Sequence, residues 1–178
     1  MDLAPALTAP DAPEPFSPRW MKEALISKLS GFVERTGIPV RHEAIEGETF
    51  LPGLTIMKGT LIVDPARLEW PGDILHEAAH IALAPPSRRA VIGGKLSVTP
   101  AEEMAALAWS YAAALGAEVD PAIVFHEGGY KQGGRELCDS YAAGLASGGP
   151  GVPMLQWYGM TRGFPRMDSW LRDCEDRT

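Results

Sequence analysis

The sequence has little of what marks several large classes of protein. Its 178 residues include only two cysteines, too few for a disulfide framework. No apolar run approaches the roughly 20 residues of a membrane-spanning helix, and the first residues lack the basic start and apolar core of a secretory signal. The net charge of −7 provides no basic face for a nucleic acid. We therefore expect a cytoplasmic protein that binds neither membranes nor nucleic acids.

The two cysteines, Cys138 and Cys174, lie far apart and form no C-x-x-C pair. Two free thiols in a reducing compartment are the expected state, and a single bridge that ties down the C-terminus is the alternative. With 46% hydrophobic and 22% charged residues, the composition is that of a globular protein. The length suits one domain, which we place at 17–178. Residues 1–16 are rich in proline and alanine, so we expect a flexible tail there.

The chain contains only four histidines, and two of them belong to an H-E-x-x-H motif, His76-Glu77-Ala78-Ala79-His80. Residues four apart lie on the same face of a helix, so both imidazoles can reach one metal ion. Glu77 then lies beside the metal, where a carboxylate can take a proton from a water molecule. The motif predicts a helix that binds Zn²⁺ and catalyses hydrolysis.

The residues around the motif are apolar, which indicates that its helix is buried on most sides. A solvated helix face with two ordinary histidines would not need such surroundings. Two histidines and a glutamate on a buried helix need partners, because unpaired buried polar groups are costly. A metal ion would provide that partner.

The segment before the motif helix has the pattern of one helix followed by short strands. Ser17-Pro18 predicts a helix start, as a capping residue followed by proline, and Gly37 predicts its end. Lys58-Gly59 reads as a tight hairpin turn between two strands. We therefore expect a small antiparallel sheet, with strands at 38–45, 54–57 and 60–63.

A catalytic zinc ion usually has three protein ligands and one open position. A third histidine six residues after His80 would give the metzincin pattern, but that position is Pro86. A glutamate on a following helix is the other common solution. The sequence after the motif therefore has to be searched for a carboxylate.

Thr99-Pro100-Ala101-Glu102 is a capping box that starts a helix ending at Gly116. The cap accounts for Glu102, whereas Glu103 lies beside the apolar stripe of this helix. We choose Glu103 as the third ligand. Glu102 and His126 are the alternatives, and two solvated glutamates favoured by the helix dipole are the purely structural explanation.

This order of elements resembles the ImmA/IrrE family of small zincin metallopeptidases, which are also called minigluzincin-like. The resemblance implies an α+β, zincin-like fold, in which a small antiparallel sheet packs on the H-E-x-x-H helix and a following glutamate helix. It also implies a zinc-dependent peptidase, often one that cleaves a regulatory protein. The matching stretches are 51–53, 59–65, 76–80 and 102–115.

The sequence departs from the family pattern in the second helix. That helix often reads Glu-Ala-Asn followed by Phe-Ala in the family, whereas here it reads Glu103-Met104-Ala105-Ala106-Leu107-Ala108. The missing Asn and Phe leave the alignment of the third ligand uncertain by one residue. Some relatives carry a helix-turn-helix, and this chain has no such pattern.

We expect the part of the chain after Gly116 to be mostly helical. Within it, a glycine-rich loop carries His126 and Tyr130, either of which could stabilise the oxyanion formed when water attacks a carbonyl. A loop histidine and a packed tyrosine without a catalytic role are the alternative. A helix is expected at 136–145, and the aromatic and methionine-rich end beyond it is expected to cover the core.

Together these observations predict a zinc metallopeptidase that acts on a peptide or protein. His76, His80 and Glu103 would hold Zn²⁺, Glu77 would be the general base, and His126 and Tyr130 are candidate catalytic residues. The competing interpretation is a non-catalytic or regulatory protein-binding module that keeps a zincin fold. The sequence leaves open a homo-oligomer or a regulatory protein partner.

Overall fold

A computed structural model describes residues 17–94, 96–130, 134–144 and 149–176. The predicted tail at 1–16 lies outside these residues. The described elements, in chain order, are α1 (Pro18–Arg35), β1 (Val40–His42), β2 (Leu54–Met57), β3 (Thr60–Val63), α2 (Asp73–Leu83), α3 (Pro86–Arg89), α4 (Pro100–Gly116), the 3₁₀ helix η1 (Pro121–Ile123), α5 (Glu127–Tyr130), α6 (Gly134–Ala142) and α7 (Val152–Trp157).

The sheet has three strands in the order β1-β3-β2 and is mixed. The hairpin of β2 and β3 turns at Lys58 and Gly59, whose φ angles of 49° and 71° suit a two-residue turn. The expectation of an antiparallel sheet is wrong for β1, which pairs parallel to β3. The chain crosses from β1 to the far edge of the sheet before it forms β2, so the hairpin returns β3 alongside β1 in the same direction.

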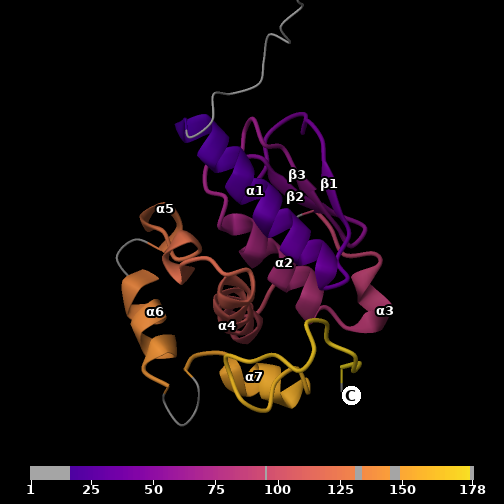
Figure 1. The fold of residues 1–178 in the computed structure, drawn as a ribbon. Coiled ribbons are helices and arrows are strands. Elements are labelled where there is room, and N and C mark those ends of the chain that lie inside the picture. Colours follow the sequence, from indigo (N-terminus) through magenta and orange to yellow (C-terminus); the bar gives the residue numbers. More distant parts are fainter. Residues whose placement is uncertain (1–16, 95, 131–133, 145–148, 177–178) are drawn as a thin grey trace, which may run out of the picture.

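Helix α2 lies in the middle of the molecule, between α1 and the sheet on one side and α4 on the other (Figure 1). The two helices α2 and α4 pack against each other, and both are rich in buried alanines. Small side chains allow two helix axes to approach closely, which fixes the position of one helix relative to the other. The fully buried alanines of these helices are Ala78, Ala79, Ala82, Ala105, Ala106, Ala108, Ala113 and Ala114.

Both ends of α4 confirm the sequence prediction. Thr99 accepts a hydrogen bond from the backbone of Glu102, and the Glu102 carboxylate accepts one from the backbone of Thr99, so the capping box is complete. The helix ends at Gly116, as expected. At the start of α1, the Ser17 hydroxyl accepts from the backbone N–H of Trp20, which confirms that capping residue as well.

The later helices surround α4. Helices α5 and α6 lie to one side of it and α7 lies against it from below in Figure 1. The helix expected at 136–145 is present as α6, although it begins and ends earlier, and residue 145 lies outside the described residues. Helix α7 was not predicted, because its six residues are too short to carry a helical period.

Helix α3 and the C-terminal segment both form hydrogen bonds with the end of α2. The guanidinium of Arg89 donates to the carbonyls of Ile81 and Ala84, and the backbone N–H of Arg172 donates to the carbonyl of Ala82. Carbonyls at a helix C-terminus lack partners within the helix, so these bonds satisfy the last turn of α2. Positive charge is also favourable at that end of a helix dipole.

Cys138 and Cys174 are both free thiols, as expected. None of the helices in the described part of the chain combines the length and apolar character needed to span a bilayer.

Replacing Gly151 with alanine should destabilise the fold more than the same change at Gly159. Both glycines have positive φ, 77° and 73°, which costs an L-residue about 1–2 kcal/mol. Only at Gly151 would the new Cβ also meet backbone, 2.0 Å from the carbonyl oxygen of Met104 on α4. We expect Gly151→Ala to lose about 1–3 kcal/mol more than Gly159→Ala in urea unfolding. Equal losses would mean that α7 does not dock closely on α4.

Candidate metal centre

The two histidines of the motif and one glutamate of α4 converge on a single point. The Nε2 atom of His76 lies 3.2 Å from Oε1 of Glu103, and the Nε2 atom of His80 lies 3.7 Å from Oε2 of the same carboxylate. One ligand atom from each of the three residues lies within 4.8 Å of the other two. The structure therefore contains a His/His/Glu group that could hold a metal ion.

The donor set and its spacing fit Zn²⁺. Zinc binds imidazole nitrogen and carboxylate oxygen at about 2.0–2.2 Å, so neighbouring ligand atoms of a tetrahedral site lie about 3.3 Å apart. The 3.2 Å between His76 Nε2 and Oε1 of Glu103 agrees with this spacing, and the 3.7 Å from His80 Nε2 is measured to Oε2, the other oxygen of that carboxylate. Three protein ligands of this kind leave a fourth position for water or substrate, as catalytic sites do.

Helix geometry decides which glutamate joins the histidines. Glu102 turns back to the start of α4, where its carboxylate accepts from the backbone N–H and the hydroxyl of Thr99 at 2.7 and 2.8 Å. Glu103 is one residue further round the helix and faces α2. This arrangement matches the reasoning from the sequence, in which the cap accounted for Glu102 and left Glu103 for the metal.

The packing around α2 holds the helix face that carries His76 and His80 in place. Its other faces are occupied by residues with no solvent exposure, such as Ile74, Leu75 and Ile81. Across the contact, the Ser110 hydroxyl donates to the carbonyls of Ala106 and Leu75, at 2.7 and 3.5 Å, and so ties α4 to α2. This packing fixes the backbone positions of His76 and His80 relative to α4.

The three residues of the cluster differ in protonation. Burial opposes protonation of His76, but the hydrogen bond and charge of Glu103 outweigh it and raise the pKa of His76. The hydrogen bond from His76 lowers the pKa of Glu103. Burial, together with the charge on His76, lowers the pKa of His80 to about 4. In the cluster without metal, Glu103 therefore favours a proton on His76, whereas His80 is neutral near neutral pH.

Glu77 lies on the same half-buried face, one position after His76. Burial raises the pKa of its carboxyl above the ordinary value, and the nearby charges of Asp73 and Glu103 act in the same direction. A carboxylate with a raised pKa is a stronger base, which suits a group that accepts a proton during a reaction. Its catalytic role stays a prediction.

His126 does not join the cluster. Its Nε2 atom lies 2.9 Å from Oδ1 of Asp73, its Nδ1 atom accepts from the backbone N–H of Gly129 at 3.2 Å, and its ring stacks on Trp70 at 4.3 Å. Because Nδ1 accepts, the proton of the neutral ring lies on Nε2 and is donated to Asp73. An oxyanion-stabilising role for His126 stays a prediction, and it requires one of these bonds to open.

Asp73 was missed by the sequence analysis. It lies on the first turn of α2, three residues before His76, and is buried. Burial raises its pKa, and the hydrogen bond from His126 opposes that effect. Its spacing of three and four residues from His76 and Glu77 was a usable signal, since such residues share a helix face. Its partner His126, just before α5, could not be identified from the sequence.

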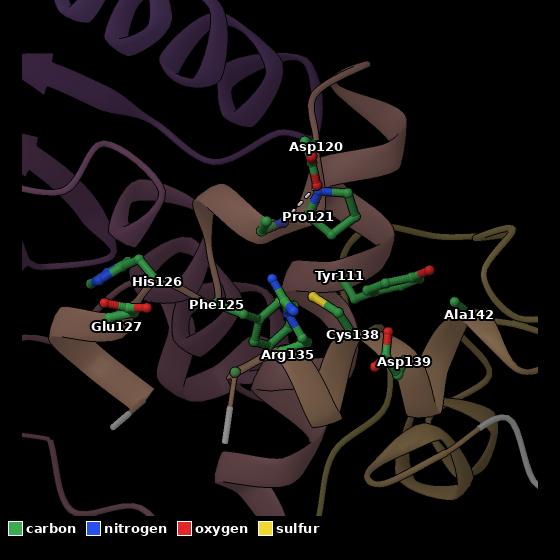
Figure 2. Close-up of a pocket in the computed structure, with 12 residues that line it drawn as sticks. Tyr111, Asp120, Pro121, Phe125, His126, Glu127, Arg135, Cys138, Asp139 and Ala142 are labelled. Atoms are coloured by element: carbon green, nitrogen blue, oxygen red, sulfur yellow. Dashed lines mark hydrogen bonds between the residues drawn. The ribbon is translucent and has the colours of Figure 1, made fainter. Parts of the chain in front are cut away.

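A cavity of about 760 Å³ lies beside His126. Figure 2 shows His126 and Glu127 at one end of it and Asp139 and Ala142 at the other. Elements α4, η1 and α6 form its walls. The side chain of Tyr130, the other catalytic candidate of this region, lies outside what the structure describes, so its role also stays a prediction.

No family model, curated protein or solved structure matches this chain. The resemblance to ImmA/IrrE peptidases therefore rests on the motifs alone. The structure is that of an α+β protein with a three-stranded mixed sheet and, in the described residues, seven α-helices. It brings His76 and His80 next to Glu103, in an arrangement consistent with a zincin-like site.

Zinc binding at pH 6.5 should release between about one half and one proton per chain. The pKa of His76 is raised above 6.5, so more than half of the metal-free protein carries that proton, which a metal-bound imidazole must give up. His80, with a pKa of about 4, contributes almost none. Titration calorimetry in buffers of different ionisation enthalpy measures this number. Affinity should rise with pH until His76 is neutral, and an affinity that is flat between pH 5.5 and 7.5 would contradict the assignment.

Proposed function

We propose that this protein is a zinc-dependent metallopeptidase that hydrolyses amide bonds in peptides or proteins. The observation that carries the proposal is the convergence of His76, His80 and Glu103 beside the raised-pKa carboxyl of Glu77. A site that only stabilises a fold usually closes all four positions of zinc with protein ligands. Three ligands with a base next to them suit catalysis better.

When bound, zinc supplies Lewis acidity, which lowers the pKa of water toward about 7 and polarises a carbonyl. Glu77 accepts the proton of the attacking water and then delivers it to the nitrogen of the leaving amine. The raised pKa of Glu77 makes its carboxylate a stronger base for the first transfer, and the carboxyl formed in that step is the proton donor for the second. The hydrogen bond between Asp73 and His126 anchors the first turn of α2, just before His76 and Glu77.

The ligand assignment is tested by comparing Glu103→Gln with Glu102→Gln. We expect about one zinc ion per chain in the wild type, close to none in Glu103→Gln, and wild-type content in Glu102→Gln, because glutamine also serves in a capping box. Mass spectrometry of the metal in dialysed protein measures the content. Retention of zinc by Glu103→Gln would move the third ligand to another residue.

Catalysis is tested with Glu77→Gln. The variant should keep its zinc and lose roughly 10²- to 10⁴-fold in the rate of peptide-bond cleavage, since proton transfer by a positioned residue contributes about that much. The substrate would be an unstructured protein, with products followed by mass spectrometry. An equal rate in the variant and the wild type would rule out Glu77 as the base. A zinc-loaded wild type that cleaves nothing would favour a regulatory binding module instead.

A further inference from the structure

A small hollow adjoins the candidate metal centre on the side of His80. It measures about 60 Å³ and lies between the end of α2, α3 and the segment that leads into α4. His80 forms part of its wall, so whatever enters the hollow lies next to the metal ligands. The residues that line it are His80, Leu83, Ala84, Pro85, Arg88, Ile92, Leu96, Ser97, Val98 and Glu102.

The lining is chiefly apolar. Six of its residues carry hydrocarbon side chains, and the hollow has two acidic or basic residues besides His80. The carboxylate of Glu102 is engaged by the backbone and hydroxyl of Thr99, which directs its charge to the helix cap. Arg88 is exposed and belongs to the rim. The interior therefore favours an uncharged, apolar group.

Backbone hydrogen bonds hold the outer wall of the hollow in place. The N–H of Gly94 donates to the carbonyl of Ile56 on β2 at 2.9 Å, and the carbonyl of Ile92 accepts from the N–H of Gly59 at 2.8 Å. These bonds attach the wall to the edge of the sheet. Because the sheet also packs on α2, the outer wall and His80 are fixed relative to each other.

The inner wall is held in the same way by α3 and by the C-terminal segment. The carbonyl of Ala84 accepts from the guanidinium of Arg89 at 2.9 Å, and the carbonyl of Leu83 accepts from that of Arg172 at 3.4 Å. Both walls are therefore formed before any ligand arrives. A preformed apolar hollow selects its occupant by size.

The volume limits what can enter. A cavity of about 150 Å³ is enough to bind benzene, whereas this hollow has less than half of that volume, about 60 Å³. It suits a methyl or branched aliphatic group and excludes an aromatic ring. A residue next to the bond being cut is the part of a peptide that would reach it, since that residue adjoins the metal.

We propose that this hollow is a specificity site, which receives a small aliphatic side chain of alanine or valine size next to the scissile bond. The inference rests on the proposed peptidase function and narrows its substrates to polypeptides with such a residue at the cut. Aromatic side chains at that position are rejected. Val98 and Ala84 set the size of the hollow from opposite walls.

Three variants test this size limit without touching the candidate metal ligands. Val98→Ala enlarges the hollow at a residue that is 41% exposed, so the fold should tolerate it. Ala84→Leu fills the hollow from the α2 side. Val91→Ala, at a residue that is 73% exposed and outside the lining, is the matched control for loss of a valine from the same segment.

The probes are small hydroxamates, which bind zinc directly. They form two series, with the side chain on the acyl side or on the amine side of the metal-binding group. Each series has a methyl, an isopropyl and a benzyl member. Calorimetry measures their affinity for the zinc-loaded proteins, and metal analysis of the same samples reports zinc. In one of the two series, the isopropyl compound should bind wild type about tenfold more tightly than the benzyl compound. Val98→Ala should narrow that ratio, Ala84→Leu should weaken isopropyl binding about tenfold, and Val91→Ala should behave as wild type.

The outcomes separate the two proposals. If the wild type takes up zinc but binds all side chains equally in both series, or if Val98→Ala leaves the ratio unchanged, the specificity site is wrong and the metal site stands. If the wild type takes up no zinc, the proposed function fails, and the specificity site fails with it. Should Ala84→Leu not fold, Val98→Ala decides the question alone.

Discussion

The close packing of α2 on α4 is the contact on which the rest of the structure depends. Both helices are rich in buried alanines, and the helix that carries the two histidines lies directly against the helix that carries Glu103. A shift of one helix relative to the other by about 1 Å would be enough to spoil a metal site. The packing of α2 on α4 therefore also determines the geometry of the candidate metal centre.

Packing the helices this closely also removes water from the polar face of α2, and the electrostatics of the site follow from that loss. Burial keeps His80 neutral, with a pKa of about 4, and raises the pKa of Glu77. Glu103 acts in the opposite direction on His76, whose pKa it raises, and so favours a proton there. A divalent cation would replace that proton and accept an electron pair from each of the three ligands. Binding a cation would therefore offset the free-energy cost of burying these polar groups.

Features set by neighbours in the sequence were predictable, and features set by distant residues were not. The H-E-x-x-H face, the cap of Thr99 with Glu102 and the hairpin at Lys58 and Gly59 each depend on residues within four positions, so their patterns can be read directly. The parallel partner of β1 depends on where the chain returns after a long connection. The bond between Asp73 and His126 joins residues 53 positions apart. Neither has a local signature.

His126 illustrates why a residue type alone is a weak guide to its role. A histidine in a glycine-rich loop near a metal motif suggests catalysis, yet its ring is stacked on Trp70 and bonded at both nitrogens. At Gly72, a Cβ would lie 1.9 Å from the carbonyl oxygen of Ile123, so the loop before α2 and the end of η1 touch backbone to backbone. His126 and Gly72 thus join the C-terminal part to the first turn of α2. Any movement of His126 toward a substrate would also disturb the helix that carries the candidate ligands, so the same contact that restrains His126 preserves the geometry of the metal centre.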